Sequence, residues 1–100
     1  MLPRNRRPTP PGEILRHEFL EPLGLSQKEL AEALGITRVR LSEVLRGKRA
    51  ITPDTAFRLA RFFGTTPDFW LGLQTDVSLW DTLKAHAGEY DKIKPAKTAA

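Results

Sequence analysis

Apolar residues recur three and four positions apart in several short segments, which is the spacing of a helix with one buried face. The first segment spans 11–23, and the second spans 26–35, where Ser26 and Glu29 have the spacing of a capping box. A third segment spans 37–47 and, like the second, closes with a glycine, the residue that most often follows a helix. These patterns predict three consecutive short helices.

Two later segments begin with the same three residue types. Thr52-Pro53-Asp54 and Thr66-Pro67-Asp68 each combine a capping threonine, a proline whose missing N–H costs nothing at a helix start, and an acid near the positive helix end. The helix after Thr66 continues, or is followed by a sixth short helix, as far as Leu83. No segment alternates apolar and polar residues between hairpin turns. The chain is therefore predicted to be all-α, with five or six helices. We expect the aromatic residues at helical spacing to be mostly core: Phe57, Phe62, Phe63, Phe69 and Trp70.

The two ends of the chain differ in composition from the segment between them. Residues 1–10 hold three prolines and three arginines, and residues 87–100 are polar and contain lysines. Neither stretch has enough apolar surface to offset the entropy of ordering it. We therefore expect a flexible basic arm at 1–10, one helical domain at 11–86 and a disordered tail at 87–100.

The composition also excludes several classes of site. There is no cysteine, and the two histidines, His17 and His86, are far apart, so no disulfide framework or clustered metal site is expected. The acids Glu13, Glu18 and Glu21 have no paired partner for acid–base catalysis. No apolar stretch approaches the roughly 18 residues that a membrane span needs, and no apolar run follows the basic start. We expect a cytoplasmic protein without enzymatic activity, metal, cofactor or membrane contact.

Positive charge is concentrated in one part of the chain. Between Ile36 and Arg61 there are seven basic and two acidic residues, a local net charge of +5, against +4 for the whole chain. A basic cluster confined to one segment is typical of a phosphate-binding face, and a solvated charged face explains the charge alone equally well.

The turn Gly35-Ile36-Thr37 decides between these interpretations. A three- or four-residue turn that contains glycine lets two helices cross steeply, and the small Ala31 permits their close approach. Ile36, Leu41 and Val44 are expected to fill the wedge between the two helices. This arrangement is a helix-turn-helix, whose second helix enters the major groove of DNA.

The side of the second helix opposite the wedge is polar. Arg38 is suited to bind guanine bidentately, Val39 to pack on a thymine methyl group, and Glu43 either to accept from cytosine or to orient an arginine. Basic residues beyond this helix are placed for phosphates, and Gln27 forms a phosphate clamp with the N–H groups that open its helix. The predicted DNA-binding residues are Gln27, Thr37, Arg38, Val39, Arg40, Ser42, Glu43, Arg46, Lys48 and Arg49.

The chain from Pro11 to Gln74 resembles the lambda-repressor-like, or Xre-type, helix-turn-helix domains, and more closely the HigA/VapI group of antitoxins. The resemblance implies a lambda-repressor-like fold and a homodimer that binds a palindromic operator in double-stranded DNA. It also implies a RelE/HigB-like, mRNA-cleaving toxin that the protein neutralises. Recognition helices of this fold often carry glutamine or asparagine, whereas arginine stands at 38 and 40, so the operator sequence is not implied. The matching residues are Pro11-Gly12-Glu13-Ile14-Leu15, Phe19 to Ser26, Leu30-Ala31, Leu34-Gly35-Ile36, Gly47 to Thr52, Ala56 to Ala60 and Phe69 to Gln74.

The predicted function is therefore an antitoxin that also represses its own operon. One alternative is a phage- or plasmid-type repressor without a toxin partner, and another is a protein–protein adaptor that uses the same helices. We expect the toxin to contact the folded helices, because the 87–100 tail is short and poor in apolar anchors.

Two further surfaces have open interpretations. An apolar set after the five-helix unit forms a dimer interface or folds back as core: Leu73, Val77, Leu79, Trp80 and Leu83. The arm residues Arg4, Arg6 and Arg7 contact a DNA groove or phosphates, or remain solvated.

Overall fold

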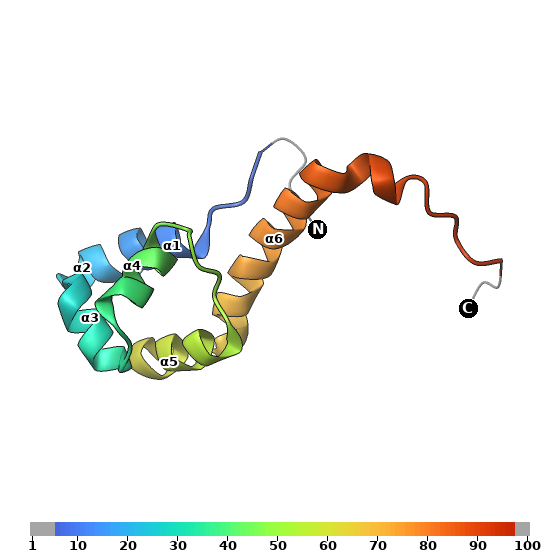
Figure 1. Cartoon of the computed structure of the whole chain (residues 1–100). Coiled ribbons are helices and arrows are strands. Elements are labelled where there is room, and N and C mark those ends of the chain that lie inside the picture. Colours follow the sequence, from blue (N-terminus) through green and yellow to red (C-terminus); the bar gives the residue numbers. More distant parts are fainter. Residues whose placement is uncertain (1–5, 98–100) are drawn as a thin grey trace.

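The helices of the protein follow one another around a single core (Figure 1), in a computed structural model that describes residues 6–97. No strand occurs within this range, so the predicted all-α fold is confirmed. The first predicted helix is continuous but contains a π-helical stretch between two α-helical ends. The bounds are α1 (Pro11–Ile14), η1 (Leu15–Leu20), α2 (Glu21–Leu23), α3 (Gln27–Leu34), α4 (Arg38–Leu45), α5 (Pro53–Phe63) and α6 (Pro67–Tyr90).

The predicted helix starts are confirmed at the side-chain level. Ser26, Thr37, Thr52 and Thr66 each accept a hydrogen bond from the backbone N–H three residues on, which satisfies a donor that the helix itself leaves unpaired. At Ser26 the capping box is complete, because the Glu29 carboxylate also accepts from the Ser26 N–H at 2.9 Å. These hydrogen bonds hold the pKa of the Glu29 carboxyl below its usual range.

Trp70 on α6 lies fully buried in the core. Its indole N–H donates to Thr65 Oγ1 at 2.7 Å, so the polar end of the side chain is satisfied. Phe19 and Phe63 pack against it with ring centroids 5.0 and 6.3 Å away. The other residues of the core cluster are Leu15, Leu20, Leu30, Ala31, Leu34, Leu41, Val44, Leu45, Ile51, Ala56, Leu59 and Ala60.

The prediction that the aromatic residues are mostly core is wrong for three of them. Phe57 is 64% exposed, Phe62 43% and Phe69 40%. The buried side of α5 consists instead of small and aliphatic residues, among them Ala56 and Leu59, and the two exposed phenylalanines of that helix lie off this side.

The start of α1 crosses the end of α4 at very short range. A Cβ placed on Gly12 would lie 2.5 Å from the Val44 carbonyl oxygen and 2.6 Å from that of Leu45. Only a residue without a side chain permits this crossing, so Gly12 fixes how closely α4 is held against the first helix.

Helix α6 is longer than expected. It continues without a break to Tyr90, past residue 87, where we expected the tail to begin, and its second half projects away from the other helices (Figure 1). The division into arm, domain and tail otherwise stays a prediction. Among residues 6–97, no helix is both long and apolar enough to cross a membrane.

Candidate nucleic-acid interface

The turn between α3 and α4 has the geometry of a helix-turn-helix. Gly35 adopts φ of 72°, in the left-handed region that glycine favours, and the Ile36 N–H donates to the Ala31 carbonyl at 3.1 Å. Thr37 follows and caps α4 by accepting from the Arg40 N–H at 3.0 Å. Two residues, Gly35 and Ile36, therefore separate the end of α3 at Leu34 from the cap of α4.

The outer sides of α3 and α4 meet in a surface hollow of about 270 Å³. Its lining is Gln27, Arg38, Val39, Ser42 and Arg46, so it combines five of the predicted DNA-binding residues. Val39 is 67% exposed although it is apolar. Neither Arg38 nor Arg46 forms an ion pair with another residue of 6–97. The hollow, which we call the α3–α4 surface, therefore offers guanidinium groups, a hydroxyl and an aliphatic side chain together.

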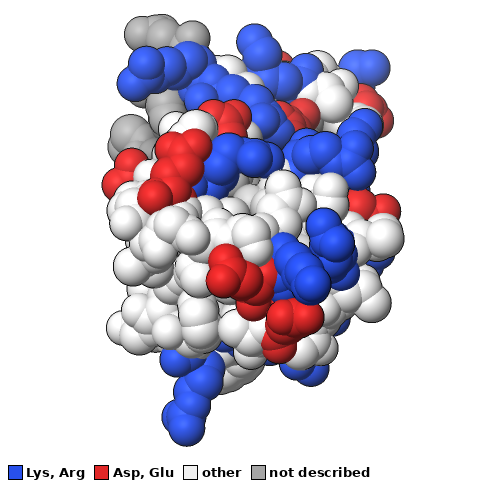
Figure 2. Space-filling view, turned by 90° about the vertical axis from the view of Figure 1, so that its left-hand side faces the viewer, with Lys and Arg blue, Asp and Glu red and all other residues white. Residues whose placement is uncertain are grey.

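Charge is distributed unevenly on the side of the molecule where α2 and α3 lie. Figure 2 shows that Lys and Arg gather in the upper part of this face, with Asp and Glu among them, while uncharged residues occupy much of the middle and lower left. A surface region rich in Lys and Arg raises the local concentration of an anionic partner.

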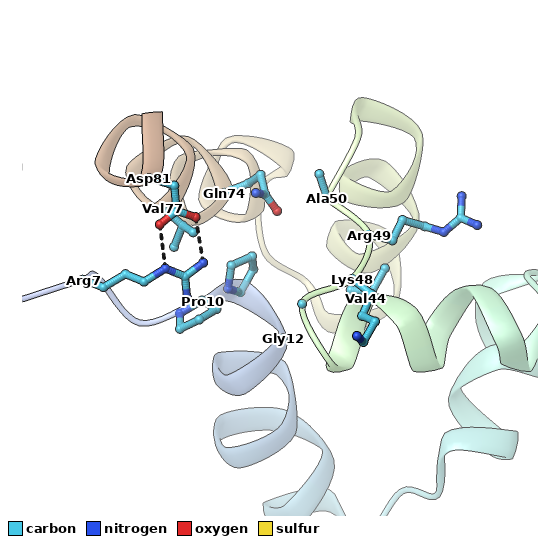
Figure 3. Close-up of a pocket in the computed structure, with 12 residues that line it drawn as sticks. Arg7, Pro10, Gly12, Val44, Lys48, Arg49, Ala50, Gln74, Val77 and Asp81 are labelled. Carbon is cyan, nitrogen blue, oxygen red and sulfur yellow. Dashed lines mark hydrogen bonds and ion pairs between the residues drawn. The ribbon is translucent and has the colours of Figure 1, made fainter. Parts of the chain in front are cut away.

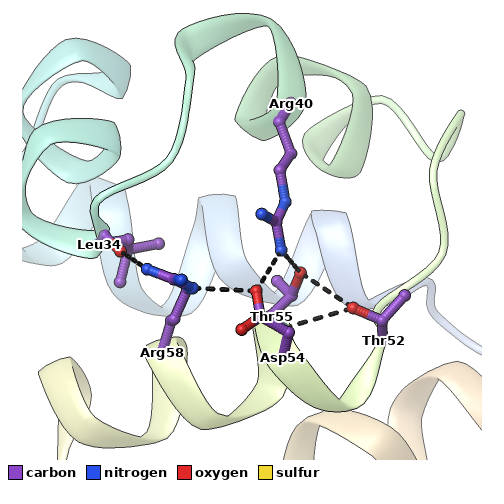
Figure 4. Close-up of polar contacts among 6 residues, drawn as sticks. All are labelled: Leu34, Arg40, Thr52, Asp54, Thr55 and Arg58. Atoms are coloured by element: carbon purple, nitrogen blue, oxygen red, sulfur yellow. Dashed lines mark hydrogen bonds and ion pairs between the residues drawn. The ribbon is translucent and has the colours of Figure 1, made fainter.

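Arg40 does not belong to the α3–α4 surface, although it was predicted as a DNA-binding residue. Its Nη2 donates to Asp54 Oδ2 at 2.8 Å and to Thr55 Oγ1 at 2.7 Å, both at the start of α5 (Figure 4). Its side chain is only 27% exposed. The spacing along α4 did not reveal this, because the acceptors lie fourteen and fifteen residues further along the chain.

The structure also shows the surroundings of the predicted DNA-binding residues near the end of α4. Glu43 accepts from Arg49 Nε at 2.9 Å and from Nη2 at 2.7 Å, so it orients an arginine, one of its two expected roles. Lys48 and Arg49 line a second hollow, which lies beside the start of α1 and the middle of α6 (Figure 3). The Gln74 Oε1 accepts from the Ile51 N–H at 2.8 Å and ties the loop after α4 to α6.

The basic arm is attached to α6 by one of its arginines. Arg7 donates from Nε and Nη2 to the two carboxylate oxygens of Asp81, each at 2.9 Å (Figure 3). This contact holds the pKa of the Asp81 carboxyl below its usual range. Arg6 is exposed, and Arg4 lies outside the described residues.

The five residues predicted for a dimer interface do not share one surface. Val77 is buried and Leu73 packs against the core. Leu79 and Leu83 are 51% and 48% exposed. Trp80 is half-buried, with the Lys84 ammonium 5.5 Å from its ring centroid.

Two features were not predicted. An open hollow of about 550 Å³ lies between α3 and α5 and includes Phe57 and Phe62. In addition, Arg58 donates from Nη1 to the Leu34 carbonyl at 2.8 Å, at the end of α3. Both features depend on the packing of α5 against α3. The spacing of residues along either helix does not predict this packing. Within residues 6–97, no group of three or more potential metal ligands comes together.

This fold and surface define a helix-turn-helix protein, and comparison with known proteins agrees. The family described as "Helix-turn-helix" matches residues 17–70, and the chain belongs to this family. It is 43% identical to the antitoxin HigA-1 of Vibrio cholerae over 95% of this chain and 90% of that protein. It is 49% identical to the HTH-type transcriptional regulator YbaQ of Escherichia coli over 81% of this chain and 72% of that protein.

A solved structure supports the same relationship. The Pseudomonas aeruginosa antitoxin HigA, solved with the higBA promoter, superimposes with a TM-score of 0.85 at 39% sequence identity. The match covers 89% of this chain and 98% of that one. The predicted resemblance to the HigA group is thereby confirmed.

Proposed function

We propose that the protein is an antitoxin that binds DNA sequence-specifically, represses its own operon and neutralises a RelE/HigB-like, mRNA-cleaving toxin. The observation that carries the DNA-binding part is the α3–α4 surface, where Val39 is exposed and where Arg38 and Arg46 are exposed without an ion pair to another residue of 6–97. The similarity to the antitoxins of Vibrio cholerae and Pseudomonas aeruginosa supports the antitoxin part. Catalysis is not part of this function.

The proposed DNA contacts follow from the position of each residue on α4. Arg38 is in the first turn, the part of a recognition helix that reaches base edges, and donates to guanine O6 and N7. Val39, beside it, packs on a thymine methyl group. Arg46 and Lys48 lie at or beyond the helix end and bind phosphates, as does Gln27 at the start of α3.

A palindromic operator requires two copies of the chain. Two α4 helices then occupy successive major grooves about 34 Å apart on one face of the DNA. For the contact between copies we propose the exposed Leu79 and Leu83 of α6 together with the half-buried Trp80. Trp80→Ala is then monomeric at micromolar concentration by light scattering, whereas Leu23→Ala, which removes an exposed leucine from α2, stays dimeric. A dimeric Trp80→Ala protein overturns this interface.

The DNA-binding part is tested by titrating the purified protein against its own promoter and against scrambled DNA at two salt concentrations. We expect a preference for the promoter of about 10³-fold or more, and an affinity that falls as salt rises. Equal binding to both sequences, or none, contradicts sequence-specific repression and favours an adaptor that uses the same helices.

The toxin-neutralising part is tested separately. The partner is a protein of the RelE/HigB class, which we expect to be encoded in an adjacent gene. Induction of that gene alone should arrest growth, and co-expression of this chain should restore growth and give a complex that co-purifies. If no such neighbour exists while promoter binding is specific, the protein is a phage- or plasmid-type repressor.

A further inference from the structure

One carboxylate connects three helices beside the proposed DNA-binding surface. Asp54 Oδ2 accepts from Arg40 Nη2 at 2.8 Å and from Arg58 Nε at 2.9 Å (Figure 4). Arg58 also donates from Nη1 to the Leu34 carbonyl at 2.8 Å. The first turn of α4, the first turn of α5 and the end of α3 are thus joined through Asp54.

Each contact falls at a position that affects how α4 is presented. Arg40 is two residues from Arg38, and its backbone N–H is held by the Thr37 cap at 3.0 Å, so both ends of this residue are fixed. The Leu34 carbonyl is one of the groups that the end of a helix leaves unpaired. A Cβ on Gly35 would lie 3.2 Å from Arg58 Nη1, so the guanidinium packs directly over the turn.

We infer that Asp54 is a positioning residue for DNA recognition, which sets the orientation of α4 relative to α3 and α5 through Arg40 and Arg58. This inference rests on the proposed DNA-binding function. It assigns Arg40 to this network, which we call the Asp54 lock, and not to the DNA.

The direction in which DNA affinity changes when Asp54 is neutralised distinguishes a positioning role from a purely electrostatic one. Replacing an acid by a neutral residue makes a DNA-binding protein more positive, and this alone raises its affinity for DNA of any sequence. A misoriented α4 instead loses base contacts, and with them the preference for the promoter over scrambled DNA. Asp54→Asn therefore should lower the preference while affinity for scrambled DNA stays equal or rises.

The chain offers a matched control. Asp68 occupies the same position in Thr66-Pro67-Asp68 that Asp54 occupies in Thr52-Pro53-Asp54, one residue into a helix capped by threonine. It forms no ion pair with another residue of 6–97. Asp68→Asn changes the net charge and the helix end in the same way but leaves the Asp54 lock intact.

The experiment measures promoter and scrambled-DNA affinities of the full-length protein and both variants, with far-ultraviolet circular dichroism to show that each is folded. For Asp54→Asn we expect the ratio of the two affinities to fall by about tenfold, the size of coupling within a charge network. For Asp68→Asn we expect a ratio within about twofold of the wild type, as for an ordinary surface change. An unchanged ratio in Asp54→Asn, or an equal fall in both variants, overturns the inference.

Arg40→Gln provides a second test, in which the salt dependence of DNA affinity shows whether Arg40 binds a phosphate. A residue that binds a phosphate contributes about 0.9 to the slope of log affinity against log salt, so its loss flattens the slope. We expect Arg40→Gln to lose promoter preference with an unchanged slope. If the slope is flatter and the affinity for promoter and scrambled DNA falls equally, Arg40 binds DNA directly and the Asp54 lock is contradicted.

Hydrogen exchange without DNA distinguishes failure of this inference from failure of the proposed function. If the lock exists, the amides of Arg40 and Leu41, which donate to Thr37 at the start of α4, exchange faster in Asp54→Asn than in Asp68→Asn or the wild type. Faster exchange without any promoter preference in the wild type contradicts DNA recognition and, with it, the role assigned to Asp54. Unchanged exchange with specific wild-type binding contradicts the lock alone.

Discussion

The inner face of α4 carries Leu41, Val44 and Leu45, each less than 5% exposed, whereas its outer face presents Arg38 and Val39 to solvent. The inner residues contribute to stability because they bury apolar surface against the first helix and the core. The outer residues make no ion pair within residues 6–97 and bury little surface, so they contribute little to the fold. Substitutions on the two faces should therefore affect different measurements.

The largest expected effect is on the inner face. Leu41 is 1% exposed, and Leu41→Ala should lower the free energy of unfolding by about 2–5 kcal/mol, because it removes buried methyl groups and leaves a cavity. Urea denaturation measures this loss. Val39→Ala on the outer face is the control, with an expected change within about 0.5 kcal/mol. Equal losses in the two variants contradict the division of α4 into two faces.

A smaller loss of stability is expected where the inner face meets α1. Gly12→Ala places a methyl group against the carbonyl oxygens of Val44 and Leu45, and should cost about 1–3 kcal/mol in the same denaturation experiment. The matched change is Gly72→Ala in α6, where nothing lies within 4 Å of an added Cβ. That variant should gain about 0.5–1 kcal/mol from helix propensity, so the two substitutions have opposite signs.

The smallest expected effect concerns Lys48, which follows α4 and is proposed to bind a phosphate. Lys48→Ala should weaken binding to promoter and scrambled DNA alike and reduce the salt slope by about 0.9. Lys92→Ala removes the same charge beyond the end of α6 and should change neither quantity. A base-selective effect of Lys48→Ala contradicts its assignment to the phosphate backbone.

The helix starts could be predicted from the sequence because their determinants are local. Ser26, Thr37, Thr52 and Thr66 each satisfy a donor only three residues away, so the short-range pattern is sufficient. The five residues of the α3–α4 surface were predictable for a related reason, since periodicity along one helix separates its polar side from its apolar side.

Features that depend on contacts between distant segments could not be predicted in the same way. Arg40 lies two residues after Arg38, so helix geometry places it on nearly the opposite side of α4. Its pairing with Asp54, however, depends on how the distant α5 packs against α4. Phe57 and Phe62 are as apolar as Phe63, yet α5 buries its smaller residues and leaves these two exposed. The end of α6 was misplaced because helix propensity continues beyond the last residue that packs on the core.

The central claim, that the outer face of α4 recognises DNA sequence, is tested most directly by Arg38→Ala. Its affinity is measured on the promoter, on scrambled DNA and on promoters with each base pair of one half-site changed. We predict a loss of about 1–3 kcal/mol on the promoter, relaxed preference at one base pair, and an unchanged free energy of unfolding. An equal loss on every DNA, with no base pair relaxed, would contradict the claim and leave Arg38 as a phosphate contact.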